Sequence, residues 1–308
     1  MKKNIPFVKE KLNWMQNEEI WPNGLRYLWT DAFGVVLLTS LHNHTGKEHY
    51  LDQAENVIAE VKRVLGRDKG FRIGELPDRH GQYYHYLAMW MYALHVLSLY
   101  RPAYHEEAVQ LIKDIHPEFI EPGVGIHWKM KEDLSGPEPG FGYGALDYFH
   151  GYVVYNLIDP DGLEHEIKQM KELIDSSYKD LTIDQDLGLG MMLWMCQFHE
   201  DEEWAQFQKE QSLNTLDDLW IEPPGYFSRQ RGRPNTKFAF TNFGISVGLQ
   251  SVNEQQDRLE KLNAYFSEFE SGDRYDRDAI THVMECNSHF PGFLVKDYDK
   301  RIIERKVE

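Results

Sequence analysis

Hydrophobic residues gather in six segments of this chain that are apolar on nearly every side. The stretch Leu87–Leu97, within "LPDRHGQYYHYLAMWMYALHVLSLY" (76–100), is apolar almost all round, as in a helix without a solvent-facing side. Segments of the same kind occupy 30–46, 146–159, 185–200, 240–254 and 278–295. Each begins with polar, small or aromatic residues and then becomes apolar. The pattern predicts six buried helices whose first turns carry groups that are costly to bury.

Amphipathic helices are predicted between these buried segments. Their apolar residues recur at spacings of three and four, with Glu, Lys and Gln at the other positions. They occupy 6–18, 48–65, 104–115, 162–177, 201–213 and 254–270. The alternation predicts an all-α fold, an (α/α)6 toroid of six helical hairpins with an apolar inner ring and an amphipathic outer ring. We expect a single domain over 1–308. An open solenoid of helix pairs is the rival, but one face of a solenoid normally meets solvent.

The connections between the predicted helices are of two lengths. Those from a buried helix to an amphipathic helix are short, such as "YRPAY" and "IDPDG". Those in the other direction are long and rich in Gly, Pro, aromatic and charged residues, as in 66–81, 123–145 and 221–240. In a closed ring all the long loops lie at one end, and loops beyond about a dozen residues are usually functional. We therefore expect a functional site at the mouth, where the buried helices begin.

Composition and charge narrow the class of protein. The 308 residues include 33 basic and 50 acidic ones, and the net charge of -17 argues against a nucleic-acid or anionic-membrane partner. Two cysteines are too few for a disulfide framework or a cysteine zinc site. The first residues lack the apolar run of a signal peptide, and no stretch reaches about 18 uninterrupted apolar residues. The sequence indicates a soluble, cytoplasmic protein, and it does not indicate an oligomeric state.

Two motifs, "HGQYYHYLAMWMYAL" and "DLGLGMMLWM", together with the helix alternation, carry a family resemblance. The chain resembles the six-hairpin glycosidase-like superfamily, whose members include glycoside hydrolases, unsaturated-uronyl hydrolases and sugar 2-epimerases. The resemblance is architectural and covers most of the chain. It implies the (α/α)6 fold and a small-molecule or oligosaccharide substrate, and it leaves the reaction unassigned.

Carboxylates at the starts of the buried helices are the first catalytic candidates. Glycosidic cleavage needs two carboxyl groups, one protonated and one ionised. Aspartate is also a favoured helix cap, so each candidate has a structural alternative. Asp78 comes first because Arg79, His80 and Gln82 crowd it, and the repulsion between Asp184 and Asp186 is expected to raise one pKa. The carboxylate candidates are Asp31, Asp78, Asp147 and Asp186.

Histidines provide a second set of candidates, suited to proton abstraction from a sugar carbon. A base that titrates near neutrality serves that step, and the candidates are His80, His85, His127 and His150. The spacing of five between His80 and His85 does not suit a metal pair on one helical face, for which spacings of three or four are preferred. We therefore predict no metal site and no cofactor.

Arginine, aromatic and amide side chains of the long loops are the predicted substrate-binding residues. A ring of guanidinium groups at one mouth would bind a carboxylate or phosphate, unless neighbouring carboxylates neutralise it. Aromatic residues of these loops, among them Trp29 and Tyr83, can stack their flat rings on sugar faces, although such rings also pack loops onto a rim. The predicted substrate-binding residues are Arg79, Gln82, Tyr84, His127, Trp128, Tyr143, His150, Arg229, Arg231 and Arg233.

Four hypotheses about function follow. The leading one is a carbohydrate-active acid–base hydrolase, acting on a sugar that carries a carboxylate or phosphate. The first alternative is a sugar epimerase or isomerase with histidine bases. A second is a terpene-cyclase-like enzyme on an isoprenoid, with Asp186 of the "DQD" triplet as its acid. The third is a non-catalytic helical scaffold that binds a protein partner through its acidic short-loop face.

Overall fold

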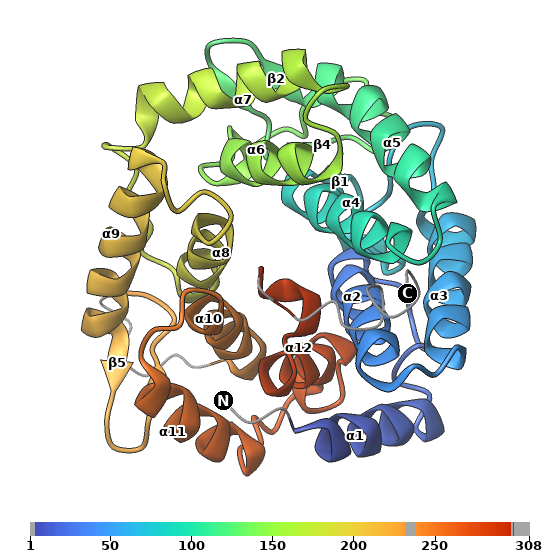
Figure 1. Ribbon diagram of the computed structural model, residues 1–308, viewed down its shortest axis with the longest axis vertical. Coiled ribbons are helices and arrows are strands. Elements are labelled where there is room, and N and C mark those ends of the chain that lie inside the picture. The colour runs from blue at the N-terminus through green and yellow to red at the C-terminus, as the bar shows by residue number, and fades with distance from the viewer. Residues whose placement is uncertain (1–3, 232–237, 297, 299–308) are drawn as a thin grey trace, which may run out of the picture. The chain divides into compact units, whose positions relative to one another are not determined.

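The computed structural model describes residues 4–231, 238–296 and 298, and they form two compact units. The continuous unit consists of Leu25–Ser177. The split unit combines the described residues of Met1–Gly24 with those of Tyr178–Asp299. Within the described residues, twelve α-helices account for most of both units (Figure 1). No helix in this part of the chain is both long and apolar enough to cross a membrane.

The continuous unit contains three helical hairpins. In each, the first helix is buried on nearly all sides and the second is buried on one face. The buried helix α4 packs against both α2 and α6 (Figure 1). The hairpins are α2 (Leu28–Thr45) with α3 (His49–Leu65), α4 (Tyr84–Ser98) with α5 (Ala103–Phe119), and α6 (Asp147–Ile158) with α7 (Glu164–Ser177).

The split unit also contains three hairpins, and one of them joins the two ends of the described chain. In this unit α10 is the central buried helix and packs against both α8 and α12. The pairs are α8 (Asp186–Cys196) with α9 (Glu203–Leu219), α10 (Ala239–Ser251) with α11 (Gln256–Ser267), and α12 (Ala279–His289) with α1 (Ile5–Asn17). All twelve helices predicted from the hydrophobic pattern are therefore present, with bounds that differ mainly at their ends.

Glycines allow α8 and α10 to approach closely. A Cβ atom at Gly248 would lie 2.2 Å from the carbonyl oxygen of Gly190, and one at Gly190 would lie 2.7 Å from the carbonyl oxygen of Gly244. Real side chains do not tolerate such distances, so the crossing requires glycine. The glycines of "DLGLGMMLWM" thus serve helix packing.

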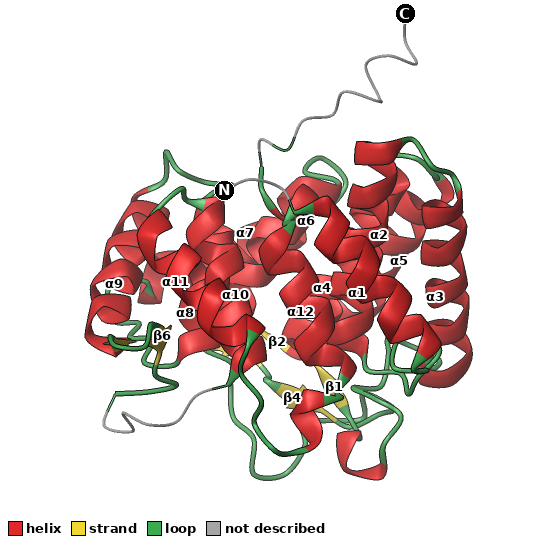
Figure 2. Cartoon of the chain, turned by 90° about the horizontal axis from the view of Figure 1, so that it is seen from below, coloured by secondary structure: helices red, strands yellow, loops and turns green. Residues whose placement is uncertain are grey.

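The long loops carry short antiparallel ribbons that tie them together. β1 (Gln82–Tyr83) pairs with β4 (Lys129–Met130), which joins two long loops of the continuous unit at the start of α4. This places both loops at one end of that unit, as the loop lengths predicted (Figure 2). Two further ribbons lie within single loops. They pair β2 (Ile120–Glu121) with β3 (Gly125–Ile126), and β5 (Trp220–Ile221) with β6 (Tyr226–Phe227).

The start of α4 corrects the expectation for Asp78. The helix begins at Tyr84, and Asp78 lies in a separate 3-10 turn, η1 (Pro77–Arg79), where it is exposed. Gly81, with a φ of 78°, turns the chain between the two elements. Asp78 is therefore neither a cap of the buried helix nor one of its first residues.

Candidate active site

A histidine and an aspartate meet at the starts of two neighbouring buried helices. His85 lies in the first turn of α4 and Asp147 is the first residue of α6. The His85 Nδ1 atom is 3.5 Å from Asp147 Oδ1. Asp147 is 3% exposed, and its Oδ1 accepts no hydrogen bond of normal geometry from the described residues. Buried carboxylate oxygens normally have donors, so this pair is the strongest candidate for acid–base chemistry in the continuous unit.

The loop before α6 fixes the position of the Asp147 carboxylate. A Cβ atom at Gly144 would lie 1.4 Å from Asp147 Oδ2, so the carboxylate packs directly against the glycine backbone. The backbone N–H of Gly144 donates to the carbonyl oxygen of Ile126, which holds this loop on the β2–β3 ribbon. Glycine at 144 is therefore a requirement of the site.

His150 lies one helical turn after Asp147 and is almost completely buried. Burial, assisted by the positive form of His85 nearby, lowers the pKa of His150 to about 3. The imidazole of His150 is therefore neutral at pH 7, and only His85 of the two histidines keeps access to solvent.

Aromatic rings surround His85. The ring centroids of Trp29, Tyr83 and Tyr86 lie 5.8, 5.3 and 4.7 Å from that of His85. The indole Nε1 of Trp29 is buried and donates to no acceptor among the described residues. A buried indole N–H without an acceptor is a candidate hydrogen-bond donor to a substrate oxygen. The wall of the site is thus apolar with a few placed polar groups, as in small-molecule pockets.

An aromatic shelf, defined as Tyr83, His127, Trp128 and Tyr143, continues outward from His85. The ring of Tyr83 stacks on Trp128 at 5.5 Å between centroids, and Tyr143 stacks on His127 at 5.0 Å. Trp128 is 40% exposed and Tyr143 is 47% exposed, which is unusual for such large rings. Tyr143 is held in place because its hydroxyl donates to Glu121. The shelf presents flat apolar faces to solvent next to the His85–Asp147 pair.

Three predicted site residues have their polar groups occupied inside the protein. Both carboxylate oxygens of Asp31 accept hydrogen bonds, one from the guanidinium of Arg26 at 3.0 Å and one from the backbone of Tyr27. Gln82 is fully buried, and its side-chain amide forms hydrogen bonds with three backbone groups of the loops. It accepts from the N–H of Phe71 and donates to the carbonyl oxygens of Lys69 and Glu132.

Tyr84 is likewise a core residue. It is fully buried, and its hydroxyl lies 2.7 Å from that of Tyr155. The polar groups of Asp31, Gln82 and Tyr84 are thus engaged with other groups of the protein, which favours structural roles for these three side chains over the predicted catalytic and substrate-binding ones.

The other predicted residues of the loop before α4 lie at the surface. His80 is exposed, with its Nε2 3.7 Å from Glu138 Oε1. The guanidinium of Arg79 lies 3.9 Å from the ring centroid of Tyr27. Tyr27 in turn shares a hydrogen bond with the Tyr86 hydroxyl, so Arg79 is connected to the aromatic wall rather than to the His85–Asp147 pair.

The split unit contains a second acidic candidate. Asp186, the first residue of α8, is 2% exposed and accepts hydrogen bonds from the Thr241 hydroxyl and from the backbone of Leu187. Burial raises the pKa of Asp186 to about 6, although those two hydrogen bonds and Arg229 oppose the shift. A carboxyl group with this pKa holds its proton in mildly acidic solution, as a general acid requires.

Among the described residues, the arginines of the long loops are mostly paired with carboxylates, so their charges are neutralised and do not form a ring of positive charge at the mouth. Arg231 pairs with Asp218, Arg72 Nε lies 2.8 Å from Glu132 Oε1, and Arg277 lies 2.8 Å from Glu18. Arg229 packs its guanidinium over the ring of Phe238 at 4.9 Å. Arg233 lies outside the described residues. The expectation of an anion-binding ring of arginines is therefore not supported by the described side chains.

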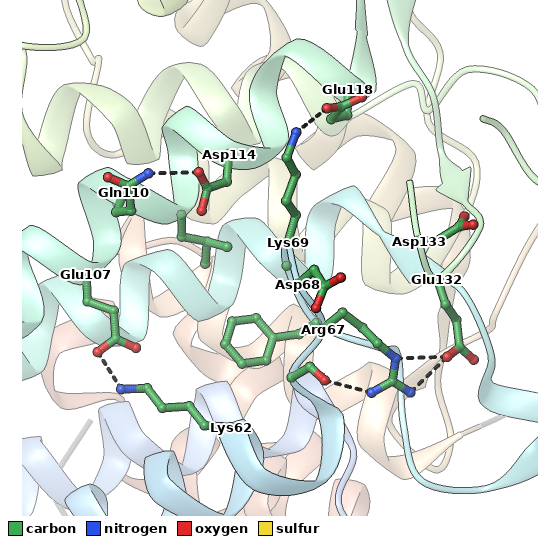
Figure 3. A pocket seen from close by; sticks show the side chains of 14 residues that line it. Lys62, Arg67, Asp68, Lys69, Glu107, Gln110, Asp114, Glu118, Glu132 and Asp133 are labelled. Carbon is green, nitrogen blue, oxygen red and sulfur yellow. Dashed lines mark hydrogen bonds and ion pairs between the residues drawn. The ribbon is translucent and has the colours of Figure 1, made fainter. Parts of the chain in front are cut away.

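A hollow of about 1100 Å³ on the continuous unit lies apart from this chemistry (Figure 3). It runs between α3, α5 and the loops at 66–71 and 132–133. Its charges pair with one another, as in Lys62–Glu107 at 2.6 Å and Arg67–Glu132 at 2.8 Å. None of its lining residues belongs to the His85–Asp147 pair or to the aromatic shelf, so its size does not make it the candidate site.

Trp29, one of the aromatic residues that the sequence places at the mouth, lies in the wall around His85. Sequence reasoning missed Tyr86, which completes that wall, and Thr241, which donates a hydrogen bond to Asp186. Thr241 lies 55 positions from Asp186, and nothing in the spacing of the two residues indicates their contact. No group of three or more His, Cys, Asp or Glu side chains in the described part of the chain is arranged to hold a metal ion.

Comparison with solved structures identifies the fold. A GH76 α-mannanase of Bacteroides thetaiotaomicron superposes with a TM-score of 0.68 at 9% identity, covering 94% of this chain and 96% of that one. A D-mannose isomerase gives 0.64 at 11% identity, with 94% and 98% covered. The cellobiose 2-epimerase of Spirochaeta thermophila gives 0.61 at 11% identity over the full length of both chains. The chain has the (α/α)6 fold of six helical hairpins. The predicted fold class and the architectural resemblance are thereby confirmed.

Comparison of the amino-acid sequence with known proteins does not establish a family for this chain. No family model matches the chain. Thiamine-binding periplasmic proteins of Brucella abortus and Brucella suis are 30% identical to it over 145 residues. This match covers 45% of the chain and 39% of those proteins, so it does not establish a family.

Proposed function

We propose that this protein is an enzyme that acts on carbohydrates by acid–base chemistry, with His85 and Asp147 at its centre. The observation that carries the proposal is the buried Asp147 carboxylate facing the His85 imidazole at 3.5 Å, beside exposed aromatic faces. Proteins that share the fold support it, because their names describe a mannose isomerase, a cellobiose epimerase and a mannanase. Aromatic faces next to a few polar groups suit a sugar.

The pair favours proton transfer at a sugar carbon, as in an isomerase or epimerase. With Nδ1 of His85 toward Asp147, the Nε2 atom is left to take a proton from the carbon next to an open-chain carbonyl. The bonding electrons move onto the carbonyl oxygen and form an enediolate, and the imidazolium is stabilised by Asp147. Protonation of the neighbouring carbon by the imidazolium, with the hydroxyl proton passing from one oxygen to the other, gives an isomer. Protonation of the same carbon on its opposite face, by water or a second acid, gives an epimer.

The surrounding groups support each part of this step. The Trp29 indole N–H has no acceptor among the described residues and suits the developing oxyanion. His150, neutral because its pKa is about 3, adds no positive charge that would compete with protonation of His85. The aromatic shelf offers stacking faces for the sugar body.

Hydrolysis of a glycoside is the second candidate, and Asp186 favours it. Burial raises the pKa of Asp186 to about 6, so this residue has the protonation behaviour of an acid that donates to a leaving oxygen. An isoprenoid substrate is less well supported, because the wall around His85 carries several hydrogen-bonding groups. A protein-binding scaffold would not need a buried carboxylate without donors.

One experiment separates these candidates. The protein is incubated in heavy water with a panel of monosaccharides, disaccharides, uronides and sugar phosphates, and the products are followed by NMR. Deuterium at a sugar carbon indicates an isomerase or epimerase, whereas new reducing ends without carbon-bound deuterium indicate hydrolysis. A folded sample that transforms no member of the panel would contradict the proposal.

A further inference from the structure

A second pocket, which we call the α1–α12 pocket, lies within the split unit. It has a volume of about 270 Å³ and is bordered by α1, α10, α11, α12 and the turn η2 (Arg274–Asp276). Neither Asp186 nor any residue of the His85–Asp147 pair lines it. Its size suits a small organic molecule rather than an oligosaccharide.

Aromatic rings form most of the apolar wall of this pocket. Phe243 and Phe266 are buried, with ring centroids 5.7 Å apart, and Phe266 packs edge-on against Phe269 at 5.5 Å. Their π faces carry partial negative charge, and several such rings around one space attract a cation. The aromatic residues that line the pocket are Trp14, Phe238, Phe243, Phe266, Phe269 and Tyr275.

The charged residues of the pocket are mainly acidic. Lys11 Nζ lies 2.7 Å from Glu285 Oε2 and 5.1 Å from the ring centroid of Trp14, so a carboxylate already balances its charge. Hydrogen bonds from Ser271, despite a small opposing effect of burial, keep the pKa of Asp276 below its ordinary value, and Asp276 stays ionised. The other lining carboxylates are Glu270 and Asp273. The pocket therefore combines aromatic faces with a negative field.

A buried hydroxyl group in this pocket has no partner. Thr281 lies in the first turn of α12, lines the pocket and is 9% exposed. Its Oγ1 makes no hydrogen bond with any of the described residues. Buried hydroxyl groups are rarely left in this state, so Thr281 is suited to exchange a hydrogen bond with a bound molecule.

We propose that the α1–α12 pocket binds a small organic cation, a substituted ammonium compound that also carries a hydrogen-bonding group. The rings of Phe243, Phe266 and Phe269 surround the cationic head, and the acidic residues of the rim stabilise its charge. Thr281 bonds the polar group of the ligand. The site is separate from the proposed carbohydrate chemistry and does not depend on it.

A matched pair of probes tests the requirement for charge. Choline carries a quaternary ammonium and a hydroxyl group, and 3,3-dimethylbutan-1-ol is its neutral isostere. Isothermal titration calorimetry on the full chain is expected to give a dissociation constant for choline at least about tenfold lower than for the alcohol. Equal affinities, or no binding of choline, would overturn the proposal.

Variants locate the binding. Phe269→Leu removes one ring face and Thr281→Val removes the hydroxyl at nearly constant volume, and each is expected to weaken choline binding by about fivefold or more. Phe198→Leu, a half-buried phenylalanine of the same unit outside the pocket, is expected to leave binding unchanged. Thermal unfolding of each variant confirms that it is folded. Unchanged affinity in both pocket variants would place choline elsewhere and refute the site.

Discussion

Asp147 faces His85 from the neighbouring hairpin, with 3.5 Å between Oδ1 of the carboxylate and Nδ1 of the imidazole. The two residues belong to helix starts that the chain separates by a complete hairpin and a long loop. Packing of α4 against α6 brings them together, and Gly144 leaves room for the carboxylate. The contact between the two side chains is thus set by tertiary packing, and a substitution can abolish it without disrupting either helix.

Replacement of Asp147 by asparagine tests this relationship. Asn keeps the size of the side chain but cannot stabilise the imidazolium of His85, so turnover is expected to fall by about a hundredfold or more. The free energy of unfolding is expected to change by less than about 1 kcal/mol, because Asp147 Oδ1 loses no hydrogen bond with a described residue. Steady-state kinetics and urea unfolding measure the two quantities. Asp78→Asn is the matched control, and its exposed position predicts near-normal turnover.

Asp31 is expected to give the opposite result. It forms a buried ion pair with Arg26, whose side chain is 3% exposed, and the loss of one partner leaves the other charge buried and uncompensated. Asp31→Asn is expected to lower the free energy of unfolding by about 3 kcal/mol or more. The folded fraction is expected to keep its turnover per active molecule. A stable Asp31→Asn variant with greatly reduced turnover would show that Asp31 has a catalytic role.

The raised pKa of Asp186 predicts that its contribution to the free energy of unfolding decreases as pH rises. Its pKa is about 6 in the folded chain, above the ordinary aspartate value of 3.8, because burial disfavours the carboxylate. Between these values the unfolded chain loses the proton first, so the contribution of Asp186 to stability falls as pH rises from about 4 to 6. Asp186→Asn lacks this titration. Its stability relative to the unmodified chain is expected to rise by about 2–3 kcal/mol between pH 4 and pH 7. Urea unfolding at several pH values measures the difference, and a constant difference would contradict it.

Trp128 is predicted to affect substrate affinity and not the chemical step. Its exposed ring stacks on Tyr83, which separates it from His85. Trp128→Ala is expected to raise KM for a disaccharide by about tenfold, the scale of one lost stacking contact, with kcat nearly unchanged. Trp128→Phe keeps an aromatic face and is expected to recover most of the affinity. A fall in kcat without a change in KM would contradict this assignment.

The fold was predictable because the signal is distributed over the whole chain. Helices such as α4 are apolar on every side, whereas helices such as α3 are apolar along one stripe only. This difference separates inner from outer helices before any contact is known. The alternation of short and long connections between the helices then indicated the end of the helices at which the candidate site is expected.

The candidate site was predictable only in part. Asp147, His85 and Asp186 are polar groups in the first turns of apolar helices, which marks them as candidates in the sequence, and the structure gives each of them a buried or half-buried position. The same pattern also marks Asp31, whose partner Arg26 lies in a loop and gives no periodic signal. Contacts between distant loops determine which polar groups remain available to a substrate. Such contacts leave no local pattern in a single sequence.

The pairing of α1 with α12 has a consequence for synthesis of the chain. Helix α1 leaves the ribosome well before α12 (Ala279–His289), and its apolar face packs on that helix. At roughly 5–20 residues per second, α1 waits on the order of tens of seconds for that partner. During this interval Val8 and Met15, fully buried in the folded protein, have no native surface to cover them. The continuous unit can assemble its own three hairpins meanwhile, so nascent-chain chaperones are expected to engage the exposed apolar face of residues 5–17 during this interval.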